Sequence, residues 1–221
     1  MKKEWSEEEL KEVARQLSNP DGETGIKTGE RMNLSNAHMI GRGIESLNIK
    51  ENEFVLEIGP GNGSHVNDIL LIAGGINYSG VDISETMIAE AEKLNQNFIE
   101  DGTVSFSLSD GNSLPFSEKS FDKIVTVNTV YFWQNPVAYG QEVLRVLKTG
   151  GIFSLVFSDK SFMQQLPFTK FGFQLYDKYT AVELLENSGF TVIDTVEEME
   201  TTQSNLGEAV QRPIVIILAT K

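Results

Sequence analysis

The feature that most constrains the fold of this chain is a short apolar strand that runs straight into a turn rich in glycine. Residues 54–58 read Phe-Val-Leu-Glu-Ile, and Gly59, Gly61 and Gly63 follow at alternate positions. Glycine permits a tight turn, and it lets the backbone approach a ligand that a side chain would exclude. Helical periodicity follows the turn. The order of strand, glycine-rich turn and helix predicts a nucleoside site at the carboxyl end of the strand.

Strand and helix patterns alternate along the rest of the chain. Short apolar runs predict further strands over 78–83, 103–108, 121–127, 152–157, 190–196 and 213–220. The alternation predicts an α/β fold with a doubly wound, mostly parallel seven-stranded sheet, helices on both faces and an antiparallel last strand. We expect one compact domain over residues 51–221, preceded by an N-terminal helical extension over residues 1–50.

The N-terminal extension contains recognisable helix boundaries. Ser6 and Glu9 stand at the spacing of a capping box, so we expect a helix to begin after Ser6. The segment Asn19-Pro20-Asp21-Gly22 predicts that this helix ends in a turn. We expect a glycine-rich loop from there to Gly29, and a second helix over residues 30–47.

Capping residues also predict where three later helices begin. Ser84 follows a strand and precedes an apolar-periodic segment, which is the position of an N-cap. Asn135 and Pro136 combine a capping side chain with a residue that suits the first helical position. Thr180 and Glu183 have the spacing of a second capping box.

The charge of the chain argues against nucleic acid as a partner. The 221 residues include 32 acidic and 18 basic side chains, which gives a formal net charge of −14. A protein that binds nucleic acid normally carries a basic patch that neutralises phosphates, and the sequence shows none. Acidity of this degree is typical of a soluble cytoplasmic surface, so we expect a cytoplasmic protein.

The residue types also limit the chemistry. The sequence has no cysteine, which excludes disulfides, thiolate nucleophiles and cysteine metal ligands. Its two histidines, His38 and His65, are widely separated, so we expect no metal site. The longest apolar run falls far short of the roughly 20 residues that span a bilayer. We expect no membrane partner, and either a monomer or a homodimer.

Two acidic residues near the glycine-rich turn distinguish between nucleoside ligands. Asp82 ends the next strand, where a carboxylate can accept hydrogen bonds from both ribose hydroxyls. Dinucleotide-binding turns follow the pattern G-x-G-x-x-G, whereas Ser64 occupies the third glycine position here. Glu57 lies inside the turn, where its charge would repel a pyrophosphate but attract an ammonium group. The charges therefore favour S-adenosylmethionine (SAM), whose methionyl end carries an ammonium group, over a nicotinamide dinucleotide.

Five segments in order resemble the motifs of class I, Rossmann-like methyltransferases that use SAM. The segments are 55–63, which reads Val-Leu-Glu-Ile-Gly-Pro-Gly-Asn-Gly, then 80–84, 109–116, 121–125 and 142–151. Their order makes the resemblance more specific than any single motif. The resemblance implies SAM as cofactor, S-adenosylhomocysteine as product and a small-molecule methyl acceptor.

The resemblance also implies roles for individual residues. The glycine-rich turn would line the methionyl part of SAM, Asp82 would hold the ribose, and Ile83 or Met87 would pack on the adenine. Asp110 would accept from the adenine amino group; the alternative is that it only forms the turn before Gly111. The implied cofactor residues, in chain order, are Glu57, Gly59, Pro60, Gly61, Gly63, Asp82, Ile83, Met87, Asp110, Gly111, Asn112, Asn128 and Thr129.

The methyl acceptor is constrained mainly by exclusion. Methyltransferases that act on nucleobases and glutamine typically carry Asn-Pro-Pro-Tyr after the fourth strand, whereas residues 128–131 read Asn-Thr-Val-Tyr. In a site of this kind, Asn128 and Thr129 would form the floor of the transfer site. The N-terminal extension is a candidate lid with Met32 and Asn36 as substrate contacts, or alternatively a helix pair that only covers the sheet.

Aromatic residues give a second candidate substrate region. Residues 158–178 are unusually aromatic for a loop, and Phe168 and Phe173 within it could enclose an apolar acceptor. The same residues could instead form a satellite core or a dimer contact. Trp133 is open to two interpretations as well, namely core packing or a pocket wall.

A general base matters only if the acceptor must lose a proton. The available candidates are His38, Tyr131 and Tyr176, although a histidine placed like His38 is more often a helix-surface residue than a base. We expect an enzyme that transfers the methyl group of SAM by in-line displacement to an O, N or C atom of a small organic acceptor. The alternatives are a SAM-binding protein without catalysis, such as a sensor or an assembly partner, and a nicotinamide-dependent oxidoreductase.

Overall fold

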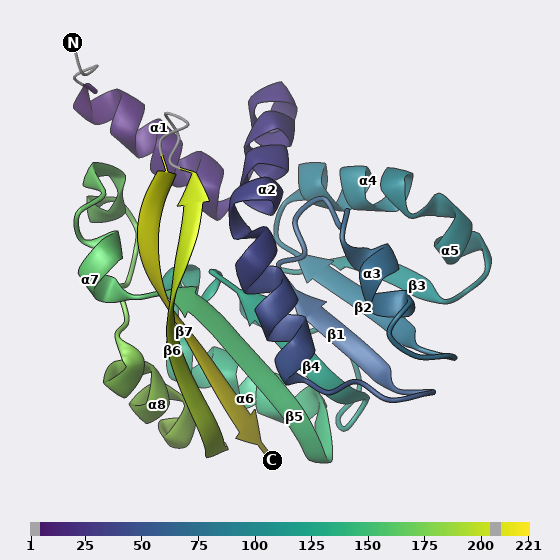
Figure 1. The fold of residues 1–221 in the computed structure, drawn as a ribbon. Coiled ribbons are helices and arrows are strands. Elements are labelled where there is room, and N and C mark those ends of the chain that lie inside the picture. The colour runs from purple at the N-terminus through teal and green to yellow at the C-terminus, as the bar shows by residue number, and fades with distance from the viewer. Residues whose placement is uncertain (1–4, 204–208) are drawn as a thin grey trace.

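The computed structural model describes residues 5–203 and 209–221, which form one seven-stranded sheet flanked by helices (Figure 1). The strands are β1 (Phe54–Ile58), β2 (Asn77–Asp82), β3 (Val104–Leu108), β4 (Phe121–Val127), β5 (Leu147–Ser158), β6 (Thr191–Gln203) and β7 (Ala209–Thr220). Their order across the sheet is β3-β2-β1-β4-β5-β7-β6. Strands β1 to β5 pair in parallel, whereas β7 runs antiparallel between β5 and β6. The predicted sheet is confirmed.

Helices cover both faces of the sheet. They are α1 (Glu7–Ser18), α2 (Gly22–Ser46), α3 (Val66–Leu70), α4 (Glu85–Leu94), α5 (Gln96–Glu100), α6 (Pro136–Val146), α7 (Lys160–Met163) and α8 (Lys178–Asn187), with short 3-10 helices η1 (Val130–Phe132) and η2 (Pro167–Lys170). One hydrophobic cluster joins α6 and α8 to the sheet, and another joins α2 and α3 to it. This two-sided arrangement is the predicted doubly wound fold.

Three of the four predicted helix caps are confirmed and one is wrong. Ser6 and Glu9 form the expected capping box, and Ser84 and Asn135 cap their helices as expected. Helix α8 instead begins three residues earlier than predicted: Asp177 accepts from the backbone amide of Thr180 at 2.9 Å. The hydroxyl of Thr180 in turn accepts from the Asp177 amide, which completes a capping box one turn upstream of the predicted one.

Helix α2 is longer at its N-terminal end than the sequence predicted. The expected glycine-rich loop up to Gly29 is wrong, because the helix begins at Gly22. Two of its glycines serve close packing instead. A Cβ at Gly25 would lie 2.7 Å from the carbonyl carbon of Pro20, and a Cβ at Gly29 would lie 2.5 Å from Met87 Sδ. Glycine therefore brings α2 close to the preceding turn and to α4 without ending the helix.

The hairpin of β6 and β7 is longer than the predicted strands 190–196 and 213–220. Its pairing continues through Glu200↔Arg212 to Gln203↔Ala209. The added part of β6 is acidic and lacks the apolar alternation on which the prediction relied, so its pairing was not visible in the sequence. This part rises beside α2 (Figure 1), where the Thr202 hydroxyl donates to the Ser35 carbonyl at 2.9 Å.

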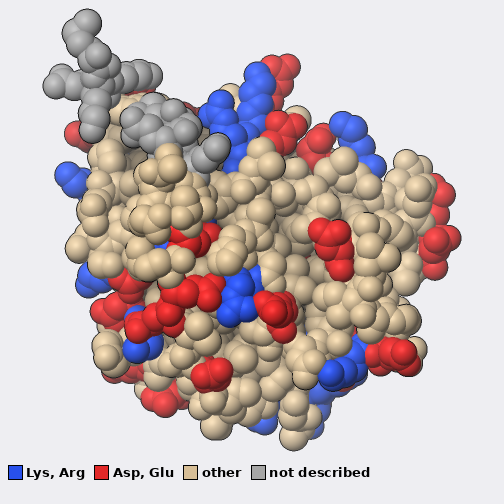
Figure 2. Space-filling model, viewed as in Figure 1, with Lys and Arg blue, Asp and Glu red and all other residues tan. Residues whose placement is uncertain are grey.

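The surface seen in Figure 2 mixes acidic and basic side chains, and the basic ones form small separate groups. An ion pair joins the N-terminal extension to the hairpin: Arg42 of α2 lies 3.0 Å from Glu198 of β6.

Within the described ranges, no helix has the length and apolar character needed to cross a membrane.

Candidate functional site

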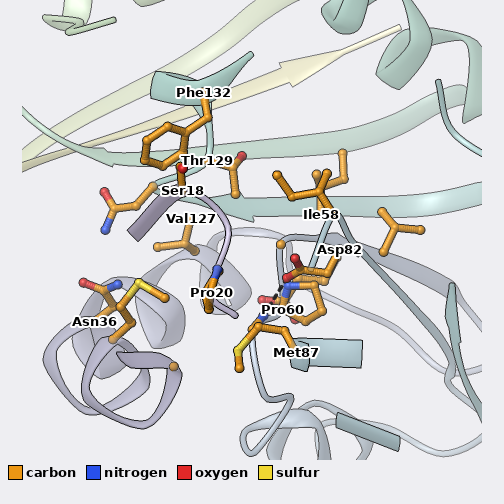
Figure 3. Close-up of a pocket in the computed structure, with 18 of the residues that line it drawn as sticks. Ser18, Pro20, Asn36, Ile58, Pro60, Asp82, Met87, Val127, Thr129 and Phe132 are labelled. Carbon is orange, nitrogen blue, oxygen red and sulfur yellow. Dashed lines mark hydrogen bonds between the residues drawn. The ribbon is translucent and has the colours of Figure 1, made fainter. Parts of the chain in front are cut away.

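A pocket lies at the carboxyl ends of β1, β2 and β4, with the N-terminal extension over it (Figure 3). The predicted cofactor residues Glu57, Gly59, Pro60, Gly61, Asp82 and Met87 are among those that line it. Strand β1 has β2 on one side and β4 on the other, so successive strands are added in opposite directions from this point. In open α/β sheets, ligands bind at such a switch point.

The turn after β1 requires glycine for different reasons at different positions. Gly59 (φ +75°) and Gly61 (φ +56°) adopt the left-handed backbone conformation that favours glycine. A Cβ at Gly59 would collide with Thr129 Cγ2, whereas a Cβ at Gly61 would meet nothing within 4 Å. Gly63 does not line the pocket, and a Cβ there would lie 3.2 Å from Ala91 Cβ of α4. Gly61 therefore leaves open space beside the backbone, inside the pocket.

Asp82 ends β2 and places a buried carboxylate in the pocket wall. Its Oδ1 accepts from the Ser84 amide at 2.9 Å, and its Oδ2 accepts from the Gly61 amide at 3.3 Å. Burial raises the pKa of Asp82 to about 6, although these amides partly oppose the rise. A carboxylate that holds two backbone donors retains lone pairs for further donors, such as two hydroxyls of a bound nucleoside.

Glu57 lies in the same wall, is 2% exposed and is held by two side chains. The Tyr78 hydroxyl donates to Oε2 at 2.7 Å, and His65 Nε2 lies 2.8 Å from the same oxygen. Burial alone would lower the pKa of His65, but the charge and hydrogen bonds of Glu57 raise it overall. The Asn33 amide of α2 lies 3.3 Å from His65 Nδ1, which joins the N-terminal extension to the glycine-rich turn.

The residues predicted to surround the adenine are only partly brought together. Ile83 and Gly111 line the pocket, and Ile83 exposes 38% of its surface. Asp110 and Asn112 lie outside the lining. The Asp110 carboxylate accepts from the amides of Asn112 and Ser113, both at 2.8 Å, so it is engaged in the turn before the pocket.

The other end of the pocket lies beyond β4 and is partly aromatic. Asn128 (φ +58°) and Thr129 follow β4 and line it together with Phe132 and Trp133. Trp133 Nε1 donates to Thr129 Oγ1 at 3.3 Å, which fixes both side chains. In Figure 3, Phe132 and Met87 lie at opposite ends of the pocket. The pocket therefore has carboxylates and the glycine-rich turn at one end and aromatic side chains at the other.

The aromatic segment 158–178 lies behind this wall and does not form it. The ring centroid of Phe173 lies 4.6 Å from that of Phe132 and 5.8 Å from that of Phe168. Neither Phe168 nor Phe173 lines the pocket. Phe173 therefore supports Phe132 from outside, and Phe168 packs on Phe173.

None of the three candidate bases lines the pocket. His38 is exposed on α2, where Nε2 lies 3.2 Å from a carboxylate oxygen of Glu198. Tyr131 donates its hydroxyl to the Ser158 carbonyl at 2.8 Å, and burial raises its pKa. Tyr176 is also buried, which raises its pKa to about 12.

The N-terminal extension contributes directly to the lining. The candidate lid residues Met32 and Asn36 both face the pocket from α2. His65 and Tyr139 line it too, and sequence reasoning gave neither of them a role. The only available signal for His65 was its position just after the glycine-rich turn, since its contact with Glu57 forms only when that turn folds back.

The residues present fit SAM. The space beside Gly61 admits a ligand close to the backbone, and Asp82 offers acceptors for ribose hydroxyls. Glu57 offers a carboxylate for an ammonium group, and Ile83 exposes an apolar side chain for a flat base. The pocket therefore offers partners for the ribose, the ammonium group and the adenine ring of the cofactor.

Comparison with known proteins agrees with this geometry. Residues 56–155 match the family model described as "Methyltransferase domain". The chain is 27% identical over 168 residues to phosphoethanolamine N-methyltransferase 1 of Arabidopsis thaliana. The aligned region covers 72% of this chain and 33% of that protein. It is 30% identical over 118 residues to demethylmenaquinone methyltransferase of Tropheryma whipplei (strain Twist), which covers 53% of this chain and 47% of that protein. The chain thus spans less than half the length of either relative.

A solved structure of a SAM-dependent methyltransferase from Aquifex aeolicus has the same fold. The two chains superpose with a TM-score of 0.67 at 18% sequence identity, and the match covers 95% of this chain and 98% of that one. Sheet order, the glycine-rich turn, the acid at the end of β2 and the family match all agree. Residues 56–155 therefore carry a methyltransferase domain, set in the same fold as a solved SAM-dependent methyltransferase.

Proposed function

We propose that this chain is an enzyme that transfers a methyl group from SAM by in-line displacement to an O, N or C atom of a small organic acceptor. The observation that carries this proposal is the division of one pocket into two ends. Asp82, Glu57 and the open space at Gly61 suit a nucleoside with an amino-acid tail, while Phe132 and α2 bound a second compartment. A transfer between two bound molecules needs both compartments in contact.

The residues of the chain would act mainly by binding and orientation. When bound, SAM supplies a methyl group on a sulfonium, and its thioether product leaves without an acid. Asp82 would hold the ribose hydroxyls and Glu57 the ammonium group. The Thr129 hydroxyl, fixed by Trp133 and Thr126, would keep the floor of the aromatic end rigid. Holding the two reactants at about 3–3.5 Å in line supplies much of the rate acceleration in such reactions.

We also propose that residues 1–50 act as a lid on the pocket. Helix α2 lines the pocket along one side and is joined to the glycine-rich turn through Asn33 and His65. It is joined to the hairpin through Arg42 and Glu198. These contacts hold α2 over both ends of the pocket, which would exclude water around the reacting atoms.

Calorimetry with SAM, S-adenosylhomocysteine and NAD tests the cofactor assignment, and release of S-adenosylhomocysteine with a panel of small acceptors tests turnover. We expect micromolar binding of the first two ligands and none of NAD. Binding without turnover on any acceptor would favour a sensor or an assembly partner. Binding of NAD alone would overturn the proposal in favour of an oxidoreductase.

The raised pKa of Asp82 is expected to make cofactor affinity depend on pH. An ionised carboxylate accepts hydrogen bonds from hydroxyl groups more strongly than a protonated carboxyl does. The affinity for the cofactor is therefore highest above the pKa of about 6, and it falls as the pH drops through that value. At about pH 5 roughly a tenth of these carboxyls are ionised, so the dissociation constant of S-adenosylhomocysteine should rise about tenfold from its value at about pH 7.5. Calorimetry at both pH values measures this change. The Asp82→Asn variant should lose this dependence, and an equally steep profile in it would assign the effect to another group, such as His65.

A further inference from the structure

A buried ion pair in the hairpin reaches α2 from outside the region that matches the methyltransferase family model. Glu200 and Arg212 are direct cross-strand neighbours and are 5% and 8% exposed. Arg212 Nε donates to Glu200 Oε1 at 2.5 Å. A buried pair of this kind gains little net stability, because desolvation of both charges offsets their attraction. The specific effect of Arg212 therefore lies in its other donors.

Those donors fix the orientation of a residue that lines the pocket. Arg212 Nη2 donates to the Ser35 carbonyl at 2.7 Å, and Nη1 donates to Asn36 Oδ1 at 3.1 Å. A guanidinium group has donors only, so it is the oxygen of the Asn36 amide that must face Arg212. The amide nitrogen occupies the other branch of that side chain, and Asn36 lines the pocket while Arg212 does not. Arg212 thus turns the N–H donors of Asn36 away from itself and toward the pocket.

The charges around the pocket disfavour an anion. Among the described residues that line it, none is lysine or arginine, and two are the carboxylates of Glu57 and Asp82. His65 lies against Glu57 and is engaged with it. No lysine or arginine of the lining can pair with an anionic acceptor, so a carboxylate or phosphate would lose its water in the pocket without gaining a charged side chain as partner. Phe132 and Ile40 add apolar surface to the same lining.

We propose that the methyl acceptor is an uncharged molecule with an apolar body and an oxygen that accepts a hydrogen bond from the Asn36 amide. Arg212 is then a positioning residue that aims this amide. The proposal rests on the proposed function, since it names the acceptor class of the same pocket. The oxygen belongs to a carbonyl or a hydroxyl group, and the apolar body packs against Phe132. Carboxylates and phosphates are the excluded class.

Three small probes of nearly identical shape test the acceptor class. They are 4-methylacetophenone, 4-methylbenzoate and 4-isopropyltoluene, which differ only in whether a carbonyl, an anion or an apolar group occupies the same place on the ring. Saturation-transfer NMR titrations are performed on the full chain loaded with S-adenosylhomocysteine. We expect the ketone to bind about tenfold more tightly than the benzoate, and several-fold more tightly than the apolar probe, as one neutral hydrogen bond allows. Equal or tighter binding of the benzoate would overturn the proposal, as would a ketone that does not bind.

Variants of Asn36 and Arg212 test the residues. Asn36→Asp keeps an oxygen for Arg212 but removes the donors, and Asn36→Leu removes both; each should weaken the ketone five- to tenfold and leave the apolar probe unchanged. Arg212→Met should weaken the ketone as well, because the amide can then rotate. Arg42→Met is the matched control, since it breaks another contact between α2 and the hairpin without touching a pocket residue.

Calorimetry of S-adenosylhomocysteine separates the two proposals. If the cofactor product binds normally to all variants and the Asn36 variants bind the ketone as tightly as the unmodified chain, the acceptor proposal is wrong and the proposed function stands. If the cofactor product does not bind the unmodified chain, the proposed function itself fails. Equal loss of ketone affinity in Arg42→Met and Arg212→Met would reduce Arg212 to a general structural role and would also overturn its assignment.

Discussion

Replacing Asp82 by asparagine is expected to weaken binding of S-adenosylhomocysteine about 100-fold and at the same time to stabilise the free protein. The loss of affinity follows because two hydroxyls lose a charged acceptor, and hydrogen bonds to a charged group contribute about 1.5–3 kcal/mol each. Asparagine presents only one acceptor, and that acceptor is neutral. Calorimetry at about pH 7.5 measures the affinity.

The gain in stability follows from the pKa of Asp82. Burial raises this pKa to about 6 in the folded protein, above its value in the unfolded chain. For an acid shifted in this direction, the folded state is penalised at every pH above the folded pKa, and the penalty disappears below the unfolded pKa. A rise of about two units corresponds to roughly 2–3 kcal/mol at neutral pH. Asparagine removes the charge, but its amide nitrogen cannot accept, so one of the two bonds from Ser84 and Gly61 is lost. We therefore expect a net gain of about 1 kcal/mol.

Thermal unfolding of the free protein measures this gain as a rise of a few degrees in Tm. Asp101→Asn is the matched control, because Asp101 is an exposed acid outside the pocket lining. It should change neither affinity nor Tm. Unchanged affinity in Asp82→Asn would overturn the ribose assignment, and a large fall in Tm would show that the carboxylate is needed for the fold.

Replacing Glu57 by alanine is expected to cause the largest loss of stability of any single change in the pocket. The substitution leaves the fully buried Tyr78 hydroxyl and the His65 imidazole without their shared partner. Removing one member of a buried charged cluster typically costs about 3–5 kcal/mol. For a domain of this size the loss corresponds to a fall of roughly 10 °C in Tm.

Tyr78→Phe serves as the graded comparison, because it removes one donor from Glu57 and leaves His65 in place. Its expected cost is about 1–3 kcal/mol, below that of Glu57→Ala. Thermal and urea unfolding of both variants give the ranking. A Glu57→Ala variant that unfolds like the unmodified protein would mean that the cluster contributes nothing to stability.

The parts of the fold that depend on local sequence could be predicted, whereas those that depend on tertiary neighbours could not. Capping by Ser84 and Asn135 needs only a few consecutive residues, and both caps are present. The start of α2 was missed because a glycine can end a helix or allow close packing. Which of these Gly25 and Gly29 do depends on Pro20 and Met87, which no periodicity reveals.

The residues of the site also divide into those that local sequence predicts and those that depend on tertiary neighbours. The role of Asp82 could be predicted from its place at the end of a predicted strand. The contact of Tyr78 with Glu57 depends on the parallel register in which Val55 lies opposite Tyr78, so that Glu57 and Tyr78 share one face of the sheet two residues apart. Arg212 is harder still, because it reaches Asn36 across 176 positions of sequence through a hairpin whose outer part lacks a strand pattern.

The contact between α2 and the hairpin joins two segments that lie on either side of residues 56–155 in the sequence. A change in either segment therefore has to suit the other. A chimaera that takes α2 from a related protein and keeps this β7 would pair Arg212 with a foreign partner. Exchanging both segments at once would keep a matched pair of contacts between α2 and β7, and the exchanged α2 would also need Gly29 and Asn33, which meet Met87 and His65 at the cofactor end. With those two residues kept, the two segments form the natural unit for redesigning the enzyme.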